Sequence, residues 1–213
     1  MTTTEELLRC GVVAGPVSLA LYAAQALTRE GYDPAHHPMS LLALGEGGWV
    51  QVLAFVLTGT LHLACAVGLR RALRAGPGRV WGPRLIGAFG AGMVVAGVFT
   101  TDPGAGFPAG APAGAPRTSW HGVVHEVGFV VANLAVLAAC LVFARRFRAQ
   151  RRRGLSAACL AAPAAILLVL AWPDPGTFSL RAVAATAIAY GFVATVATAA
   201  RPTAPADPAP ART

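Results

Sequence analysis

Histidine and carboxylate side chains near the middle of this 213-residue chain have the spacing of a metal site. His121 and His125 are four residues apart, so on a helix both imidazoles lie on one face. With Asp102 as a carboxylate ligand, they form a set that suits a divalent metal such as zinc and leaves a position open for water. Such a set supports hydrolysis through metal-bound water, with Ser40 as a further candidate catalytic residue. A polar site without metal, and interfacial histidines bonded to loop carbonyls, remain open alternatives.

A second pair of polar residues is embedded in apolar sequence. His62 follows Trp49, the start of its apolar segment, by thirteen residues, which is about 19 Å at 1.5 Å per helical residue. Asn133 lies at a similar depth in another apolar segment. Polar side chains at such depth bond across helix interfaces in membrane proteins. We therefore expect His62 and Asn133 to form a structural pair, with a proton relay or a haem ligand as the alternatives.

These residues belong to a chain with the composition of a membrane protein. Hydrophobic residues make up 55% of it and charged residues 12%, with a mean hydropathy of +0.59, whereas soluble domains carry about 25% charged residues. Six apolar segments approach the roughly 20 residues that span a bilayer, and the third can be extended back to Val80. The composition predicts an all-α polytopic bundle of six transmembrane helices, at Leu7–Leu27, Trp49–Leu69, Leu85–Thr100, His121–Phe143, Leu155–Trp172 and Ala182–Ala200.

The basic residues, all of them arginine, predict the orientation of this bundle. With the N-terminus inside, fourteen arginines fall on the inner side and three on the outer side. Because arginine is enriched in cytoplasmic loops, both termini should be cytoplasmic in a cell membrane, the inner membrane of a bacterium. The net charge is +8, and the arginines that cause it lie in loops next to the spans. The expected partners are therefore the lipid bilayer and its anionic headgroups rather than nucleic acid. The tryptophans agree, since each falls at the end of a span: Trp49, Trp81, Trp120 and Trp172.

The domain organisation that follows is simple. Residues 1–200 should form one transmembrane domain, and residues 201–213, rich in proline and alanine, a disordered cytoplasmic tail. Within the third span, Ala88 and Gly92 have the small-xxx-small spacing that allows close helix packing.

Three sequence blocks resemble a family of bacterial and archaeal multipass proteins, DUF998, a domain of unknown function. The blocks are residues 37–51, residues 97–104 and residues 119–125. The family match is expected to cover nearly the whole chain except the tail. The resemblance implies an integral membrane protein and no settled activity. Besides the candidate site residues, the motif positions that carry over are Gly45, Gly48, Trp49, Pro103 and Gly122.

In the predicted topology all three blocks meet the outer face, which places an extracytoplasmic polar site at Asp102, His121 and His125. Transport or binding of a small or amphiphilic molecule fits this layout best. A metal-dependent, membrane-embedded hydrolase acting on a lipid-like substrate is the first alternative. An accessory membrane subunit is the second, although no particular protein partner is indicated.

Overall fold

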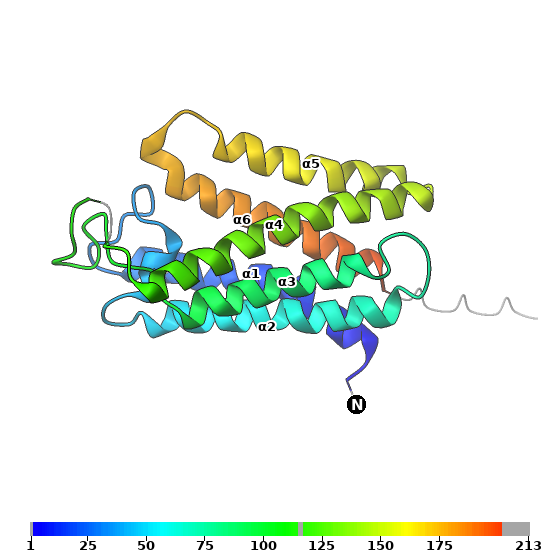
Figure 1. The fold of residues 1–213 in the computed structure, drawn as a ribbon, viewed down its shortest axis with the longest axis horizontal. Coiled ribbons are helices and arrows are strands. Elements are labelled where there is room, and N and C mark those ends of the chain that lie inside the picture. The colour runs from blue at the N-terminus through cyan, green and yellow to red at the C-terminus, as the bar shows by residue number, and fades with distance from the viewer. Residues whose placement is uncertain (1, 115–116, 202–213) are drawn as a thin grey trace, which may run out of the picture.

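The computed structural model describes residues 2–114 and 117–201, which form helices and no strand. Six helices are long and apolar enough to cross a membrane, which confirms the predicted fold class (Figure 1). Two short 3-10 helices, η1 (Met39–Ala43) and η2 (Pro175–Thr177), lie in the connections. The long helices are α1 (Thr4–Thr28), α2 (Trp49–Ala72), α3 (Trp81–Val98), α4 (Trp120–Ala149), α5 (Arg153–Leu170) and α6 (Phe178–Ala199).

The helix ends follow local capping signals that hydropathy alone does not show. α1 begins with a capping box, in which Thr3 Oγ1 accepts from the Glu6 amide and the Glu6 carboxylate accepts from the Thr3 amide. α4 continues to Ala149, past its predicted end at Phe143. Arginine is a good helix former, so the basic segment after Phe143 continues the helix beyond the apolar run.

The six helices form a closed ring. Each helix packs against its neighbours in the sequence, and α6 packs back against α1. Tyr190 of α6 is buried in the middle of the ring, where its hydroxyl lies 3.2 Å from Ser18 Oγ of α1. Its ring stacks on His62 of α2 and lies near Phe89 of α3. One aromatic side chain thus joins four of the six helices.

Small residues bring three of the helices close together. A Cβ atom on Gly59 of α2 would lie 2.6 Å from the Gly90 carbonyl of α3. A Cβ atom on Gly92 of α3 would lie 2.5 Å from the Gly128 carbonyl of α4. Gly92 of the predicted packing pair therefore lies at a close helix contact, because only glycine permits these backbone contacts.

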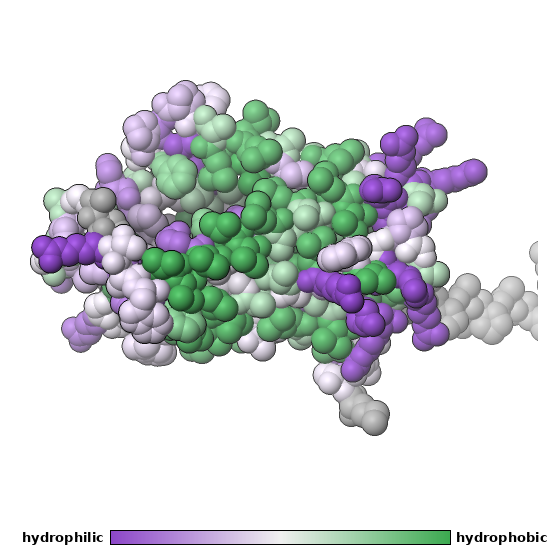
Figure 2. All heavy atoms as spheres, in the orientation of Figure 1, coloured by the Kyte–Doolittle hydropathy of each residue, from purple (hydrophilic) through white to green (hydrophobic). Residues whose placement is uncertain are grey.

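The two ends of the bundle differ in chemistry, and Figure 2 shows an apolar belt between them. At the arginine-rich end, the Arg71 guanidinium donates to the Thr2 carbonyl and that of Arg152 to the Ala199 carbonyl, so both described ends of the chain lie there. At the other end, residues 29–48 and 99–119 form the loop cap, of which residues 115 and 116 lie outside the described part. All four tryptophans lie at or near helix ends and are more than half exposed, as expected of interfacial residues. The predicted tail lies outside the described residues from position 202 onward.

Candidate functional site

Asp102 joins the end of α3 to the start of α4. It lies in the loop cap just after α3, and its carboxylate accepts two hydrogen bonds from Ser119, the N-cap residue of α4. Ser119 Oγ lies 2.5 Å from Oδ1, and the Ser119 amide nitrogen lies 2.8 Å from Oδ2. The Ser119 hydroxyl and then its amide stabilise the charged form, so both lower the pKa of Asp102 below its usual value. Asp102 is therefore a fixed negative charge, although its side chain is largely buried.

The two candidate histidines bond to backbone carbonyls at the end of α3. His121 Nδ1 donates to the Thr100 carbonyl at 2.9 Å. His125 Nδ1 lies 2.8 Å from the Ala96 carbonyl and 2.9 Å from the Phe99 carbonyl. Because carbonyl oxygens only accept, Nδ1 carries the proton in both rings. His125 thus satisfies the Ala96 carbonyl, which lies in the last turn of α3, where carbonyls lack partners within the helix.

The three predicted metal ligands lie close together but do not form a ligand set. His121 Nε2 is 3.9 Å from Asp102 Oδ1, too far for a hydrogen bond. Within the described residues, no group of three His, Cys, Asp or Glu side chains is arranged to hold a metal ion. The arrangement gives the predicted zinc site no support, and a catalytic role for these residues stays a prediction. Ser40 lies in η1, and no hydrogen bond joins it to this cluster in the part of the chain described here.

The fold explains why glycine occupies three of the motif positions. A Cβ atom on Gly122 would lie 2.0 Å from Asp102 Oδ2, so only glycine leaves room for the carboxylate. Gly45 has a positive φ of 69° in the turn before α2. A Cβ atom on Gly48 would lie 2.3 Å from the Ala43 carbonyl. Of the other motif positions, Trp49 is the first residue of α2 and Pro103 is exposed in the loop cap.

His37 connects the two segments of the loop cap, residues 29–48 and residues 99–119. Its Nδ1 accepts from the Asp33 amide at 2.8 Å, and its Nε2 donates to the Ala105 carbonyl at 3.0 Å. The ring packs between Tyr32 and Phe107. We had not predicted this role, and the only sequence signal was the position of His37 at the start of a motif block. The first loop therefore folds onto the second instead of standing apart from it.

Arg29 fixes the same cap from the end of α1. Its Nη2 donates to the Leu44 carbonyl at 2.6 Å, and its guanidinium lies 5.7 Å from the centre of the Phe107 ring. The cap is thus a folded unit with its own apolar centre, in which Leu41 and Leu42 are also buried.

An open groove of about 370 Å³ begins at Asp102 and runs down α4. Asp102 and Glu126 are its charged lining residues, and the lining beyond Glu126, away from the loop cap, is apolar. The Glu126 side chain is exposed and makes no hydrogen bond or ion pair with any described residue. Glu126 follows His125 directly, and it is not among the site residues predicted from the sequence. Four valines contribute most of the apolar lining: Val123, Val127, Val130 and Val131.

The predicted pair of His62 and Asn133 is not formed. His62 Nδ1 lies 2.8 Å from the Thr58 carbonyl, and Asn133 Nδ2 donates to the Phe129 carbonyl, so each side chain bonds within its own helix. α3 packs against both α2 and α4 and lies between them. The error was one of helix arrangement, because depth in the membrane does not determine which faces meet.

His62 belongs instead to a buried polar row along α2, which α1 joins at Gln25. Gln25 Nε2 of α1 donates to Gln51 Oε1 of α2 at 2.8 Å. Thr58 and His62 follow on the same face of α2, seven and eleven residues after Gln51, which is about two and three further turns. Three atoms of this row are buried without a partner among the described residues: Gln25 Oε1, Thr58 Oγ1 and His62 Nε2.

This architecture defines an integral membrane protein that crosses the bilayer with six helices. More particularly, a family model described as a protein of unknown function (DUF998) matches residues 12–202, so the chain belongs to that family. The resemblance of the three motif blocks is thereby confirmed. No curated protein and no solved structure matches the chain.

Proposed function

We propose that the protein binds an amphiphile of the outer leaflet that carries an ammonium headgroup. The headgroup lies at Glu126 and Asp102, and the hydrocarbon chain follows the valines of α4. The loop cap faces outward in this proposal, and the arginine-rich end faces the cytoplasm, where the surrounding bilayer contributes anionic headgroups.

The observation that carries the proposal is the position of Glu126. It follows Trp120 by six residues, which places it about 9 Å further along the helix axis than an expected interfacial residue. Its carboxylate lies on an exposed face of α4 beside Val123 and Val127, with no partner among the described residues. A charge in this position is costly unless a counter-charge accompanies it. An ammonium group at the membrane surface supplies that counter-charge.

The shape of the groove fits an amphiphile better than a compact polar solute. Its volume of about 370 Å³ lies within the roughly 300–1,000 Å³ of small-molecule sites. The four lining valines are between 44% and 56% exposed, so the groove is open to the hydrocarbon of the bilayer. Acidic side chains at Asp102 and Glu126, followed by the valines beyond Glu126, match the two ends of an amphiphile.

Charge explains the preference for a cation. Asp102 and Glu126 are the charged side chains that line the groove, and the hydrogen bonds from Ser119 keep Asp102 ionised. Two carboxylates without a lining arginine disfavour anionic headgroups. Arg117 precedes the lining residue Thr118 in the sequence but is not itself part of the lining, and the His121 imidazole is already bonded to the Thr100 carbonyl.

Binding of single-chain amphiphiles with different headgroups tests the proposal. In protein purified in a maltoside detergent, dodecylammonium should bind at a saturable site and dodecyl sulfate should not. Glu126→Gln should weaken dodecylammonium binding on the order of tenfold, because a charge pair is lost. Glu46→Gln is the matched control, since Glu46 is an exposed carboxylate of the loop cap outside the groove. Equal weakening by both variants would contradict a specific site.

A second function is favoured by the buried polar row. Unpartnered polar atoms at Gln25, Thr58 and His62 are costly within a membrane unless water or a solute reaches them. Passage of a small polar solute or a proton along α2 would use these atoms. His62→Ala protein in proteoliposomes tests this function. Loss of proton or solute flux with dodecylammonium binding intact would favour it over the first function.

A further inference from the structure

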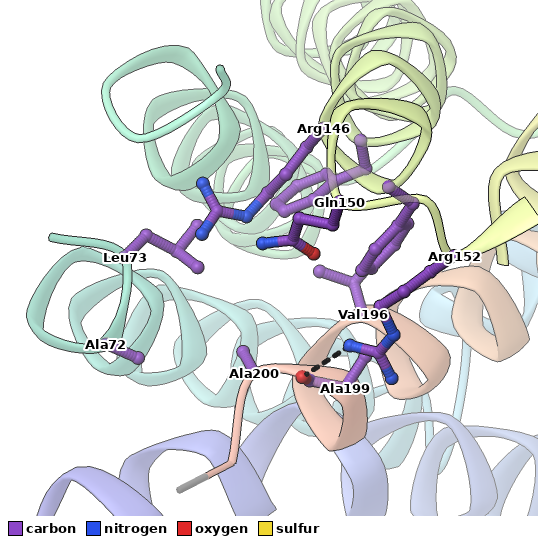
Figure 3. Close-up of a pocket in the computed structure, with 10 residues that line it drawn as sticks. Ala72, Leu73, Arg146, Gln150, Arg152, Val196, Ala199 and Ala200 are labelled. Atoms are coloured by element: carbon purple, nitrogen blue, oxygen red, sulfur yellow. Dashed lines mark hydrogen bonds between the residues drawn. The ribbon is translucent and has the colours of Figure 1, made fainter. Parts of the chain in front are cut away.

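A small pocket lies at the arginine-rich end, between the last turns of α2, α4 and α6 and the start of α5 (Figure 3). Its volume is about 140 Å³. Arg146, Gln150 and Arg152 line its polar side, and Phe143, Phe147 and Val196 line its apolar side. In Figure 3 the Gln150 amide lies between the two arginine side chains.

Both arginines are held in place by contacts that leave donors free. Arg146 Nη1 donates to the Ala75 and Pro77 carbonyls, each at 2.9 Å. Arg152 Nη1 donates to the Ala199 carbonyl at 3.3 Å, and its guanidinium lies 5.4 Å from the centre of the Phe147 ring. Among the described residues, the other guanidinium nitrogens of these arginines make no hydrogen bond. Two oriented guanidinium groups with unused N–H donors suit a planar or tetrahedral oxyanion.

Among the described residues, no aspartate or glutamate lines this pocket. Within the described residues, the ion pair between Arg9 and Glu5 is the only one between arginine and a carboxylate. The surrounding helix ends add further arginines, namely Arg70, Arg71, Arg74, Arg145, Arg148 and Arg153. Positive charge therefore exceeds the described negative charge at this end, which favours binding of an anion.

We infer that this pocket binds one phosphate group, between Arg146 and Arg152. Phosphate accepts bidentate hydrogen bonds from arginine, and the Gln150 amide adds a donor between them. The volume admits a phosphate with a small substituent. The apolar wall of Phe143 and Phe147 accommodates the carbon chain next to a phosphate ester. The phosphate belongs either to an anionic lipid of the adjacent leaflet or to a soluble phosphate compound, and the site is independent of the groove at the opposite end of α4.

Calorimetric titration of the detergent-purified protein tests the inference with three probes: inorganic phosphate, short-chain phosphatidylglycerol and short-chain phosphatidylcholine. Either or both of the first two should bind at one saturable site, more tightly than the zwitterionic lipid. Arg152→Gln should weaken this binding at least about tenfold, because the hydrogen-bond donors and the charge of one guanidinium group are lost. Phosphatidylglycerol binding more than tenfold tighter than phosphate identifies a lipid headgroup, whereas comparable binding identifies a soluble phosphate.

Arg148→Gln is the matched control. Arg148 is an exposed residue of the same helix end and lies outside the pocket. Its side chain makes no hydrogen bond to any described residue. Gln150→Leu provides a second variant that keeps the arginine contacts to the Ala75, Pro77 and Ala199 carbonyls, and it should also weaken binding. Three results would overturn the inference: no saturable binding, equal weakening by Arg148→Gln and Arg152→Gln, or full binding in Gln150→Leu.

Discussion

At the scale of single residues, the cluster around Asp102 is a joint between two helices. Asp102 accepts two hydrogen bonds from Ser119 and fits against Gly122, while His121 and His125 cap α3. The residue types that first indicated metal chemistry thus have structural partners. The unpartnered carboxylate of Glu126, beside this joint, is the group with free capacity to bind a ligand.

Asp102→Asn should lower thermal stability at neutral pH. The amide cannot accept from both the Ser119 hydroxyl and the Ser119 amide, and loss of a hydrogen bond to a charged group costs about 1.5–3 kcal/mol. The expected fall in Tm is on the order of 5 °C. Differential scanning fluorimetry of the two proteins in the same detergent measures it.

The difference between these two proteins should depend on pH. The pKa of Asp102 is lowered in the folded state, so its charge contributes stability above its ordinary pKa of about 4. That contribution shrinks as the pH falls below about 4 and disappears below the lowered pKa, where both proteins are uncharged at this position. A Tm difference that stays constant from pH 7 to pH 3 would contradict this role of the carboxylate.

At the scale of helices, hydropathy predicts the six spans because burial in lipid requires long apolar runs. It does not predict rotation about the helix axis. For that reason the depth of His62 and Asn133 was estimated from the sequence, but their pairing was wrong. The contact of His37 with Ala105 was also not predictable, since it joins two loops 68 residues apart with no periodic pattern.

Helix packing makes a prediction for two glycines of α3. Gly92→Ala should destabilise the protein by about 1–3 kcal/mol, because the added methyl group meets the Gly128 carbonyl and the backbones must separate. Gly87→Ala is the control on the same helix, since its Cβ atom would meet only the Ala66 methyl group at an ordinary 3.6 Å. Thermal unfolding in detergent compares them, and an equal effect of both substitutions would show that close approach of α3 and α4 is unimportant.

At the scale of the whole molecule, one end carries the loop cap and the other carries most of the arginines (Figure 2). Charge asymmetry predicts the direction of insertion, and the even number of spans places both described chain ends together. The two proposed sites then face different leaflets, with cations bound under the cap and phosphate bound at the arginine-rich end.

Cysteine labelling in intact cells tests this orientation. In a background with the four native cysteines replaced, His36→Cys in the loop cap should react with a membrane-impermeant maleimide. Gly76→Cys, in the connection between α2 and α3, should react only after the membrane is opened. The reverse pattern would place the loop cap in the cytoplasm and refute the outer-leaflet proposal.

The most direct measurement of the central claim is photo-crosslinking in lipid nanodiscs that contain phosphatidylethanolamine with a photoreactive acyl chain. This lipid carries the ammonium headgroup that the groove is proposed to bind. Peptide mapping should find adducts concentrated on residues 123–131 of α4, and Glu126→Gln should reduce them. The exposed leucines of α5, Leu160, Leu167 and Leu168, provide an internal comparison with ordinary lipid contact. Adducts as frequent on those leucines as on α4, and unchanged by Glu126→Gln, would contradict the account.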